Sequence, residues 1–262
     1  MSSLLDITAA SRSEVGQRKT NEDKVRVCRE GSRWVAVLAD GAGGHRGGAE
    51  ASRRAVDALE GALCDEDAEF SAATLTAAVL AAHDDVQAAQ DASHGISRMH
   101  STVVVLWIDL DRQSALWSHV GDSRLYRVRR GVVTPLTSDD SVVQRMVDAG
   151  LITAAQAESH PQKNQLIAAL GIEDGVEPHT IPSPHGLLEG DSFLLCSDGW
   201  WGALDDETIA AAVDRANGPD EWLMLMQQVI ETLAAPRQDN FSAIAVWVRG
   251  DPGESTRPMT MG

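Results

Sequence analysis

The sequence is short of basic residues and holds no basic cluster. Its 262 residues include 22 Lys or Arg and 39 Asp or Glu, which gives a formal net charge of −17 at pH 7. No window gathers five or six basic residues, the usual sign of a protein that binds polyanions. The composition therefore argues against nucleic acid and anionic membrane surfaces as partners.

Cysteines and long apolar runs are also scarce. The three cysteines, Cys28, Cys64 and Cys196, are odd in number and show no CxxC spacing. This pattern predicts neither a disulfide framework nor a zinc site, and it favours a reducing compartment. No stretch approaches the roughly 18–20 apolar residues of a membrane span, and Asp6 and Arg12 precede any long apolar run. We expect no membrane insertion and a cytoplasmic location.

No linker rich in Pro, Gly and Ser divides the middle of the chain. Apolar residues make up 43% of the sequence and charged residues 23%, an ordinary composition for a globular protein. We expect one domain over residues 1–249. Residues 250–262 are rich in Pro, Gly, Ser and Thr and are predicted to form a disordered tail.

Short apolar runs rich in Val, Leu and Trp predict strands. The predicted strands are Trp34–Ala39, Thr102–Leu110, Ala115–Val120, Leu125–Val128, Phe193–Cys196 and Ser242–Val248. Asp111–Gln113 and Arg129–Gly131 have the composition of hairpin turns between neighbouring runs. Successive hairpins of this kind indicate antiparallel sheet.

Apolar residues at helical spacing predict the helices. Leu75, Val79, Ala82 and Val86 lie on one helical face, with Ser71 as a candidate N-cap. Further helices are predicted at Gly48–Leu63, Ser141–Ala149, Asp206–Arg215 and Asp220–Ala234. Because strands and helices occur in blocks rather than as repeated βαβ units, the predicted fold class is α+β, with helices packed on the outer faces of antiparallel sheets.

Acidic residues stand at the ends of several predicted strands, mostly beside glycine. The four pairs are Asp40-Gly41, Gly121-Asp122, Asp198-Gly199 and Asp239-Asn240. Any single pair could be a plain turn, since Asp and Gly are common turn formers. Four pairs, together with Asn21-Glu22-Asp23, favour a shared cluster of carboxylates. Such a cluster repels itself unless divalent cations neutralise it, and its hard oxygen ligands suit Mg²⁺ or Mn²⁺.

The order of these motifs resembles the metal-dependent protein phosphatases of the type 2C, or PPM, family. The matching segments are Glu14–Asp23, Ala39–His45, Ser101-Thr102, Val120–Tyr126, Leu136-Thr137, Leu195–Trp200 and Asp239-Asn240. They follow the family's order over nearly the whole chain. The resemblance implies a four-layer α-β-β-α sandwich, with a central antiparallel β-sandwich flanked by helices and a dinuclear Mn²⁺ or Mg²⁺ centre at one end.

The resemblance also implies a role for each matching site residue. Asp40 corresponds to the ligand that bridges both metals, Glu22 and the Gly41 carbonyl complete one site, and Asp198 and Asp239 complete the other. Asp23 corresponds to a carboxylate that orients metal-bound water. Asp122, with Asp198, corresponds to the pair that holds a third, weaker metal in bacterial relatives. Arg18 stands where the family places its phosphate-binding arginine, with a solvated surface arginine as the plainer alternative.

The sequence departs from the family's pattern at a few positions. Ala42 replaces a histidine proposed as general acid in eukaryotic relatives, which leaves that acid unidentified; His45 is either a substitute or a loop residue. Asp139-Asp140-Ser141 stands where the family usually has Asp-His-Ser, and Met99–Thr102 where it usually has Met-Gly-Thr-Thr. His119 is expected to be a packed strand residue rather than a ligand.

Two further segments each have two possible interpretations. Residues 141–185 resemble the variable flap that borders the active site in bacterial members, and the segment either selects substrates or serves only packing. Trp200-Trp201 could contact a partner, although burial is the commoner outcome for tryptophan.

As a whole, the resemblance implies a bacterial phosphatase of phosphoserine and phosphothreonine in proteins, which opposes a protein kinase. A role in secretion-system control is an analogy with other short members. The alternatives are an inactive signalling or scaffold module with the same fold, and a metal-dependent phosphodiesterase.

Overall fold

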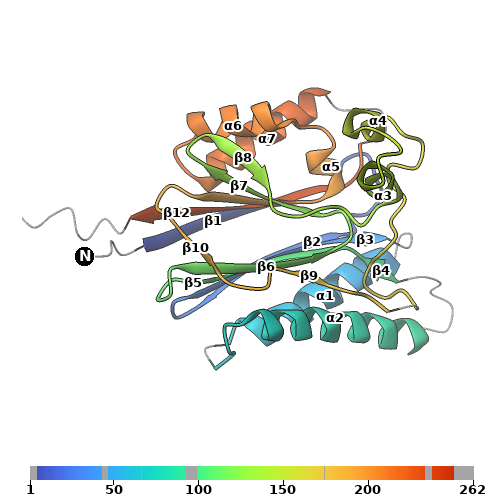
Figure 1. Ribbon diagram of the computed structural model, residues 1–262, viewed down its shortest axis with the longest axis horizontal. Coiled ribbons are helices and arrows are strands. Elements are labelled where there is room, and N and C mark those ends of the chain that lie inside the picture. The colour runs from blue at the N-terminus through green and yellow to red at the C-terminus, as the bar shows by residue number, and fades with distance from the viewer. Residues whose placement is uncertain are drawn as a thin grey trace, which may run out of the picture.

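Two antiparallel sheets stack face to face, and helices cover the outer face of each (Figure 1). The computed structural model describes residues 5–42, 47–65, 67–92, 99–173, 175–233 and 238–250. The layers follow the order helix, sheet, sheet, helix, which confirms the predicted α+β sandwich. Gly250, assigned from the sequence to the tail, ends the last strand, and the rest of the predicted tail lies outside the described residues.

One sheet has five strands and contains both the first and the last strand of the described chain. Its order is β1 (Leu5–Glu14), β12 (Phe241–Gly250), β11 (Ser192–Cys196), β7 (Arg124–Arg129) and β8 (Val132–Pro135). The outer face of this sheet packs against α6 (Asp206–Arg215) and α7 (Pro219–Leu233). Trp222 of α7 is fully buried in that layer.

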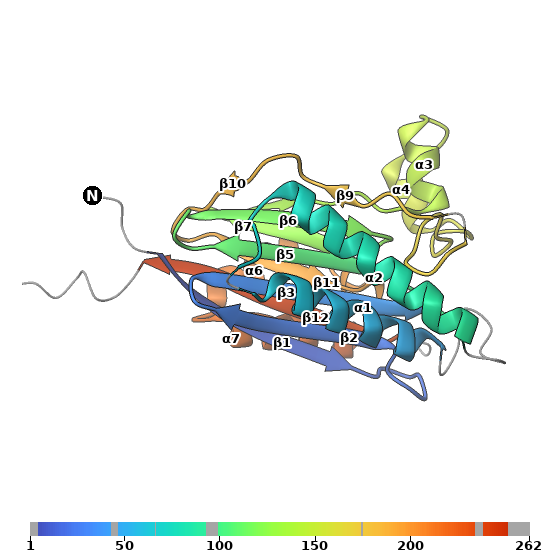
Figure 2. The ribbon, with the colours of Figure 1, turned by 90° about the horizontal axis from the view of Figure 1, so that it is seen from below.

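The other sheet carries the two longest helices. Its main path is β10 (His185–Gly186), β6 (Ser114–Val120), β5 (Val103–Asp109), β3 (Arg33–Ala42) and β2 (Asp23–Glu30), with β4 (His100–Ser101) paired to β3 and β9 (His179–Thr180) paired to β6. Helices α1 (Gly47–Leu63) and α2 (Ala72–Ala92) lie across its outer face (Figure 2).

Both faces of the central strands are buried, which explains their continuous apolar sequences. In β5, Val103, Val105 and Trp107 face the helices, whereas Val104, Leu106 and Ile108 face the opposite sheet. Successive side chains of a strand point to opposite faces, so a strand covered on both sides needs apolar residues at every position. This is the pattern from which the strands were predicted.

The six predicted strands and five predicted helices are confirmed, with small shifts at their ends. The predicted helix Asp206–Arg215 has the bounds of α6, while Ala234 of the last predicted helix lies outside the described residues. Ser71 accepts a hydrogen bond from the Thr74 backbone N–H at 3.1 Å, as expected of an N-cap. Arg130 and Gly131 both have positive φ, +55° and +75°, which suits a two-residue hairpin between β7 and β8.

Several elements were not predicted. Strand β1 has only Ile7 fully buried, and β2 alternates valine with charged residues, so neither shows a long apolar run. In the flap region, the predicted helix Ser141–Ala149 is α3 (Val142–Asp148), whereas α4 (Ala154–Glu158), β9 and β10 were not predicted. Helices α3 and α4 lie at the same end of the sandwich as β4 and α5 (Asp198–Trp201) (Figure 1).

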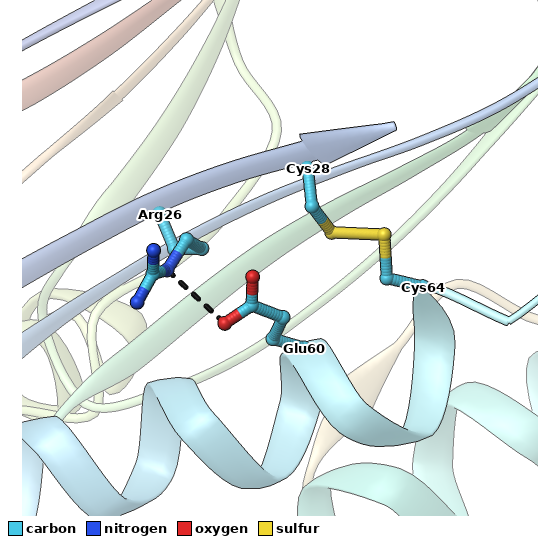
Figure 3. Close-up of a disulfide and its surroundings, with 4 residues drawn as sticks. All are labelled: Arg26, Cys28, Glu60 and Cys64. Atoms are coloured by element: carbon cyan, nitrogen blue, oxygen red, sulfur yellow. Dashed lines mark ion pairs between the residues drawn. A yellow bond between two sulfur atoms is a disulfide. The ribbon is translucent and has the colours of Figure 1, made fainter. Parts of the chain in front are cut away.

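The expectation of no disulfide is wrong. Cys28 on β2 and Cys64, one residue beyond α1, form a disulfide with Cα atoms 6.4 Å apart (Figure 3). Helix α1 packs on the sheet and brings the two residues together, a tertiary contact that their separation of 36 residues does not reveal. The Arg26–Glu60 ion pair, 3.1 Å between Nε and Oε2, lies beside it. Cys196 is free and buried. Because disulfides are rare in the cytosol, the cysteines no longer favour a reducing compartment.

Among the described residues, no helix combines the length and the apolar character needed to cross a membrane.

Candidate metal centre

Asp40 lies at the centre of a group of acidic residues at one end of the sandwich. It stands near the end of β3, directly across the strand pair from Asp23 at the start of β2. The side chains of Asp23 and Asp198 are both within hydrogen-bonding reach of the Asp40 carboxyl group. Burial, and then the charges of the neighbouring carboxylates, raise the pKa of Asp40 well above its usual range.

Glu22 and the Gly41 carbonyl face the same small space beside Gly48. A Cβ atom on Gly48 would lie 2.7 Å from the Gly41 carbonyl oxygen and still closer to Glu22 Oε2. The Gly41 N–H also donates to the Glu22 carbonyl oxygen at 3.2 Å. Two oxygen ligands proposed from the sequence for one metal ion are therefore neighbours, and only glycine at position 48 leaves both in place.

Asp198 and Asp239 reach the group from the opposite sheet. Asp198 is the first residue of α5, which follows β11, and Asp239 precedes β12. Burial, and next the charge of Asp239, raise the pKa of Asp198. Arg18 Nη2 donates to Asp239 Oδ2 at 2.5 Å, while the Arg18 side chain remains 58% exposed. The arginine therefore stands at the solvent-facing rim of the carboxylates.

Asp122 is buried close to Asp198. Burial, followed by the charges of Asp198 and Asp139, raises the pKa of Asp122 to about 8. The Asp122 carbonyl oxygen accepts a hydrogen bond from Trp201 Nε1 at 2.9 Å. The structure thus brings Asp122 and Asp198 into electrostatic contact, as the third-metal assignment requires.

Polar residues with no role assigned from the sequence hold these ligands in place. Ser197 Oγ donates to Asp23 Oδ2 at 2.9 Å, and Thr102 Oγ1 accepts from the Asp40 backbone N–H at 3.1 Å. Asn240 Oδ1 accepts from the Glu22 backbone N–H at 2.8 Å. All three lie in the motifs quoted above, and that membership was the only available signal of their function.

The donor set fits divalent cations. Asp23 Oδ1 is buried and has no hydrogen-bond partner, so one oxygen of this carboxylate is left for a ligand or for water. The carboxylates of Asp40, Asp122 and Asp198 all have raised pKa values because they are buried and repel one another. Hard cations with oxygen ligands, Mg²⁺ and Mn²⁺, relieve this repulsion.

Four other residues singled out from the sequence are Ala42, His45, Trp200 and Trp201. Ala42 is exposed at the end of β3 and cannot transfer a proton, and His45 lies outside the described residues. Trp200 is fully buried, as expected of a structural tryptophan. Trp201 is partly buried, and the Arg124 guanidinium lies 3.5 Å above its ring.

Known proteins resemble the chain over nearly its whole length. The sequence pattern of the family described as Protein phosphatase 2C matches residues 11–244. The serine/threonine protein phosphatase PstP of Mycobacterium tuberculosis is 34% identical over 96% of this chain, and the chain spans about half, 50%, of that relative's length.

Two solved structures extend this comparison. The catalytic domain of PstP, in complex with 2 manganese ions, has a TM-score of 0.80 and 32% identity, covering 94% of this chain and 99% of that one. PppA of Pseudomonas aeruginosa, described as a key regulatory component of T6SS, has a TM-score of 0.76 and 32% identity, covering 92% of this chain and 97% of that one. With its sandwich fold and its carboxylate cluster, the chain belongs to the protein phosphatase 2C family of metal-dependent protein phosphatases.

Proposed function

We propose that the protein is a metal-dependent phosphatase of phosphoserine and phosphothreonine in proteins, with its catalytic domain over residues 1–249. The observation that carries the proposal is the cluster of acidic side chains around Asp40 with Arg18 at its exposed rim. Phosphate binding requires positive charge, and a site lined by acids acquires it from bound cations.

The chain's own residues would hold two Mn²⁺ or Mg²⁺ ions. Glu22 and the Gly41 carbonyl would serve one ion, Asp198 and Asp239 would serve the other, and Asp40 would serve both. A third, weaker ion would lie between Asp122 and Asp198. When bound, such a pair of ions supplies an activated water and stabilises charge on a phosphoryl group.

The other residues position the substrate and water. Arg18 can offer two parallel N–H donors to phosphoryl oxygens, because its guanidinium is largely exposed. Asp23 is fixed through Oδ2 by Ser197, and its unpartnered Oδ1 can accept a hydrogen bond from water and orient it. No side chain is assigned as the acid that protonates the leaving serine or threonine, since the methyl side chain of Ala42 has no acidic proton to donate.

The substrates and partners in this proposal follow from the relatives. PstP is named a serine/threonine protein phosphatase, so phosphorylated proteins and the kinase that produces them are the proposed partners. A role in secretion-system control rests on the likeness to PppA alone. A cytoplasmic location belongs to the same proposal, because the kinase that produces the substrates consumes ATP and therefore works inside the cell. Alkylation of Cys28 and Cys64 in freshly lysed cells tests it, since the two residues react only as free thiols.

The activity is tested with a phosphothreonine peptide in Mn²⁺, in Mg²⁺ and in EDTA. We expect phosphate release only with a divalent metal, its loss in Asp198→Ala, and normal release in Asp206→Ala, which removes an exposed carboxylate at the start of α6. Turnover in EDTA would refute the proposal. Metal binding without turnover would instead support an inactive scaffold, and faster hydrolysis of a phosphodiester would support a phosphodiesterase.

A further inference from the structure

A second group of possible metal ligands lies at the base of the flap and includes two histidines. His119 on β6, Asp140 just before α3 and His179 on β9 each offer one ligand atom, and these atoms lie within 4.8 Å of one another. Within the part of the chain that the structure describes, no other group of three His, Cys, Asp or Glu residues meets this distance. The residues belong to segments far apart in sequence that meet where β9 pairs with β6 (Figure 2).

His119 is oriented as a metal ligand would be. Its side chain is only 5% exposed, and its Nε2 lies 2.8 Å from the Ser138 carbonyl oxygen. A carbonyl only accepts, so Nε2 carries the hydrogen and Nδ1 carries the free electron pair. Nδ1 is buried and has no hydrogen-bond partner. Metal-binding histidines commonly donate their second N–H to a backbone carbonyl in this way. Burial also lowers the pKa of His119 and favours the neutral ring that a metal needs.

Asp140 and His179 complete the group. Asp140 Oδ2 accepts the Gly121 backbone N–H at 2.9 Å, which fixes the carboxylate, and Asp140 Oδ1 lies 2.9 Å from His179 Nε2. His179 is the cross-strand partner of His119, and the two rings stack with centroids 4.9 Å apart. The His179 side chain is 52% exposed, so an ion can enter from solvent and keep water in its remaining positions.

We propose that His119, Asp140 and His179 bind a divalent transition metal ion, with Zn²⁺ as the best match to two imidazole nitrogens and one carboxylate oxygen. This site differs in chemistry from the all-oxygen centre around Asp40, and it does not depend on the proposed phosphatase activity. His119 is packed in its strand, as expected from the sequence. The proposal departs from the expectation that it is not a ligand, because its buried Nδ1 is left to bind an ion.

A metal ion at this site would join two points at the ends of the flap to β6 of the seven-stranded sheet. Asp140 lies two residues before α3, the first flap helix, and His179 lies near the flap's far end, while His119 belongs to β6. The same Asp140 carboxylate holds the Gly121 N–H, one residue before Asp122. The bound ion would therefore restrain the flap beside the carboxylates of the candidate metal centre.

The test is calorimetric titration of the whole protein with Zn²⁺ in excess Mg²⁺. We expect one Zn²⁺ ion to bind to the wild-type protein and to Asp198→Ala, and at least tenfold weaker binding to His179→Ala. His160→Ala removes another flap histidine, outside the group, and should bind as the wild type does. Equal Zn²⁺ affinity in His179→Ala and the wild type would overturn the proposal, and so would Zn²⁺ binding that is lost in Asp198→Ala but kept in His179→Ala.

His179 is exposed enough that its replacement by alanine should leave the fold intact, which circular dichroism can verify. Trypsin cleavage after Lys163, an exposed flap residue, gives a second measurement. Zn²⁺ should slow this cleavage severalfold in the wild-type protein and not in His179→Ala. Equal rates with and without Zn²⁺ in the wild-type protein would overturn the restraint of the flap.

Discussion

Replacing Gly48 by alanine should weaken metal binding while leaving every proposed ligand in the sequence. The added Cβ would lie 2.7 Å from the Gly41 carbonyl oxygen and closer still to Glu22 Oε2. A carbon and an oxygen atom need more than about 3 Å, because packed interiors tolerate almost no overlap. The Glu22 side chain can turn away, but Gly41 belongs to the backbone of β3 and cannot move without disturbing Asp40.

The size of the effect follows from comparable changes at metal sites. Displacing groups that orient metal ligands usually lowers metal affinity by about 10- to 100-fold, which corresponds to about 1.4–2.8 kcal/mol. Alanine is otherwise favoured over glycine in a helix by about 1 kcal/mol. Gly48→Ala should therefore lose Mn²⁺ affinity without a matching loss of fold stability.

Gly61 provides the matched control, because it lies in the same helix and nothing lies within 4 Å of its added Cβ. Gly61→Ala should raise the free energy of unfolding by about 0.5–1 kcal/mol and leave Mn²⁺ affinity unchanged. The assay is the dependence of phosphopeptide hydrolysis on Mn²⁺ concentration, with direct Mn²⁺ titration beside it. Wild-type Mn²⁺ affinity in Gly48→Ala would refute the placement of Glu22 and the Gly41 carbonyl around one ion.

Three further predictions concern the substrate, the disulfide and a buried histidine. Arg18→Ala should raise KM for a phosphopeptide and leave Mn²⁺ affinity unchanged; a loss of Mn²⁺ affinity instead would show that the arginine supports the metal rather than the phosphate. Reduction by dithiothreitol should lower the free energy of unfolding by up to about 4 kcal/mol in urea melts, because the Cys28–Cys64 bond closes a loop with a sequence separation of 36. Cys64→Ser should not respond to the reductant, and an unchanged wild-type urea midpoint would contradict this account. His83 is buried and its Nδ1 accepts the Gly171 N–H at 3.1 Å, and burial lowers the pKa of His83 below its usual value of 6.5. Since the unfolded chain then binds a proton more readily than the folded protein, the free energy of unfolding should fall as pH drops below 6.5. Urea melts at several pH values should show a smaller fall in His83→Asn than in the wild type. An equal dependence of the free energy of unfolding on pH in the two proteins would contradict the lowered pKa of His83.

The sequence predicted the central strands well because burial on both faces leaves an unbroken apolar run. Residues Val103–Ile108 of β5 show this pattern. Strand β2 lies at the edge of its sheet and alternates Val25 and Val27 with charged side chains, so the same criterion overlooked it. Period-two alternation was the signal available for such a half-exposed strand.

The sequence proposed the acidic residues of the candidate site, but not the side chains that hold them in place. Motif order singled out Asp40 and its partners, and the structure gathers them at one end of the sandwich. The contact between Ser197 and Asp23 joins residues 174 positions apart, and no local pattern encodes it. The same holds for the stacked rings of His119 and His179, and for the disulfide. Each depends on how helices and sheets pack, which periodicity and composition do not describe.

The position of β12 ties formation of the candidate site to the last strand of the described chain. This strand lies between β1 and β11, and Asp239 lies two residues before it. On the ribosome, β1 and β11 leave the exit tunnel before their shared neighbour and present unpaired backbone edges that can recruit other chains. Only when β12 inserts do Arg18 and Asp239, from opposite ends of the described chain, come into contact. A nascent or truncated polypeptide that ends before this strand would therefore carry most of the fold's residues and still lack a complete candidate centre.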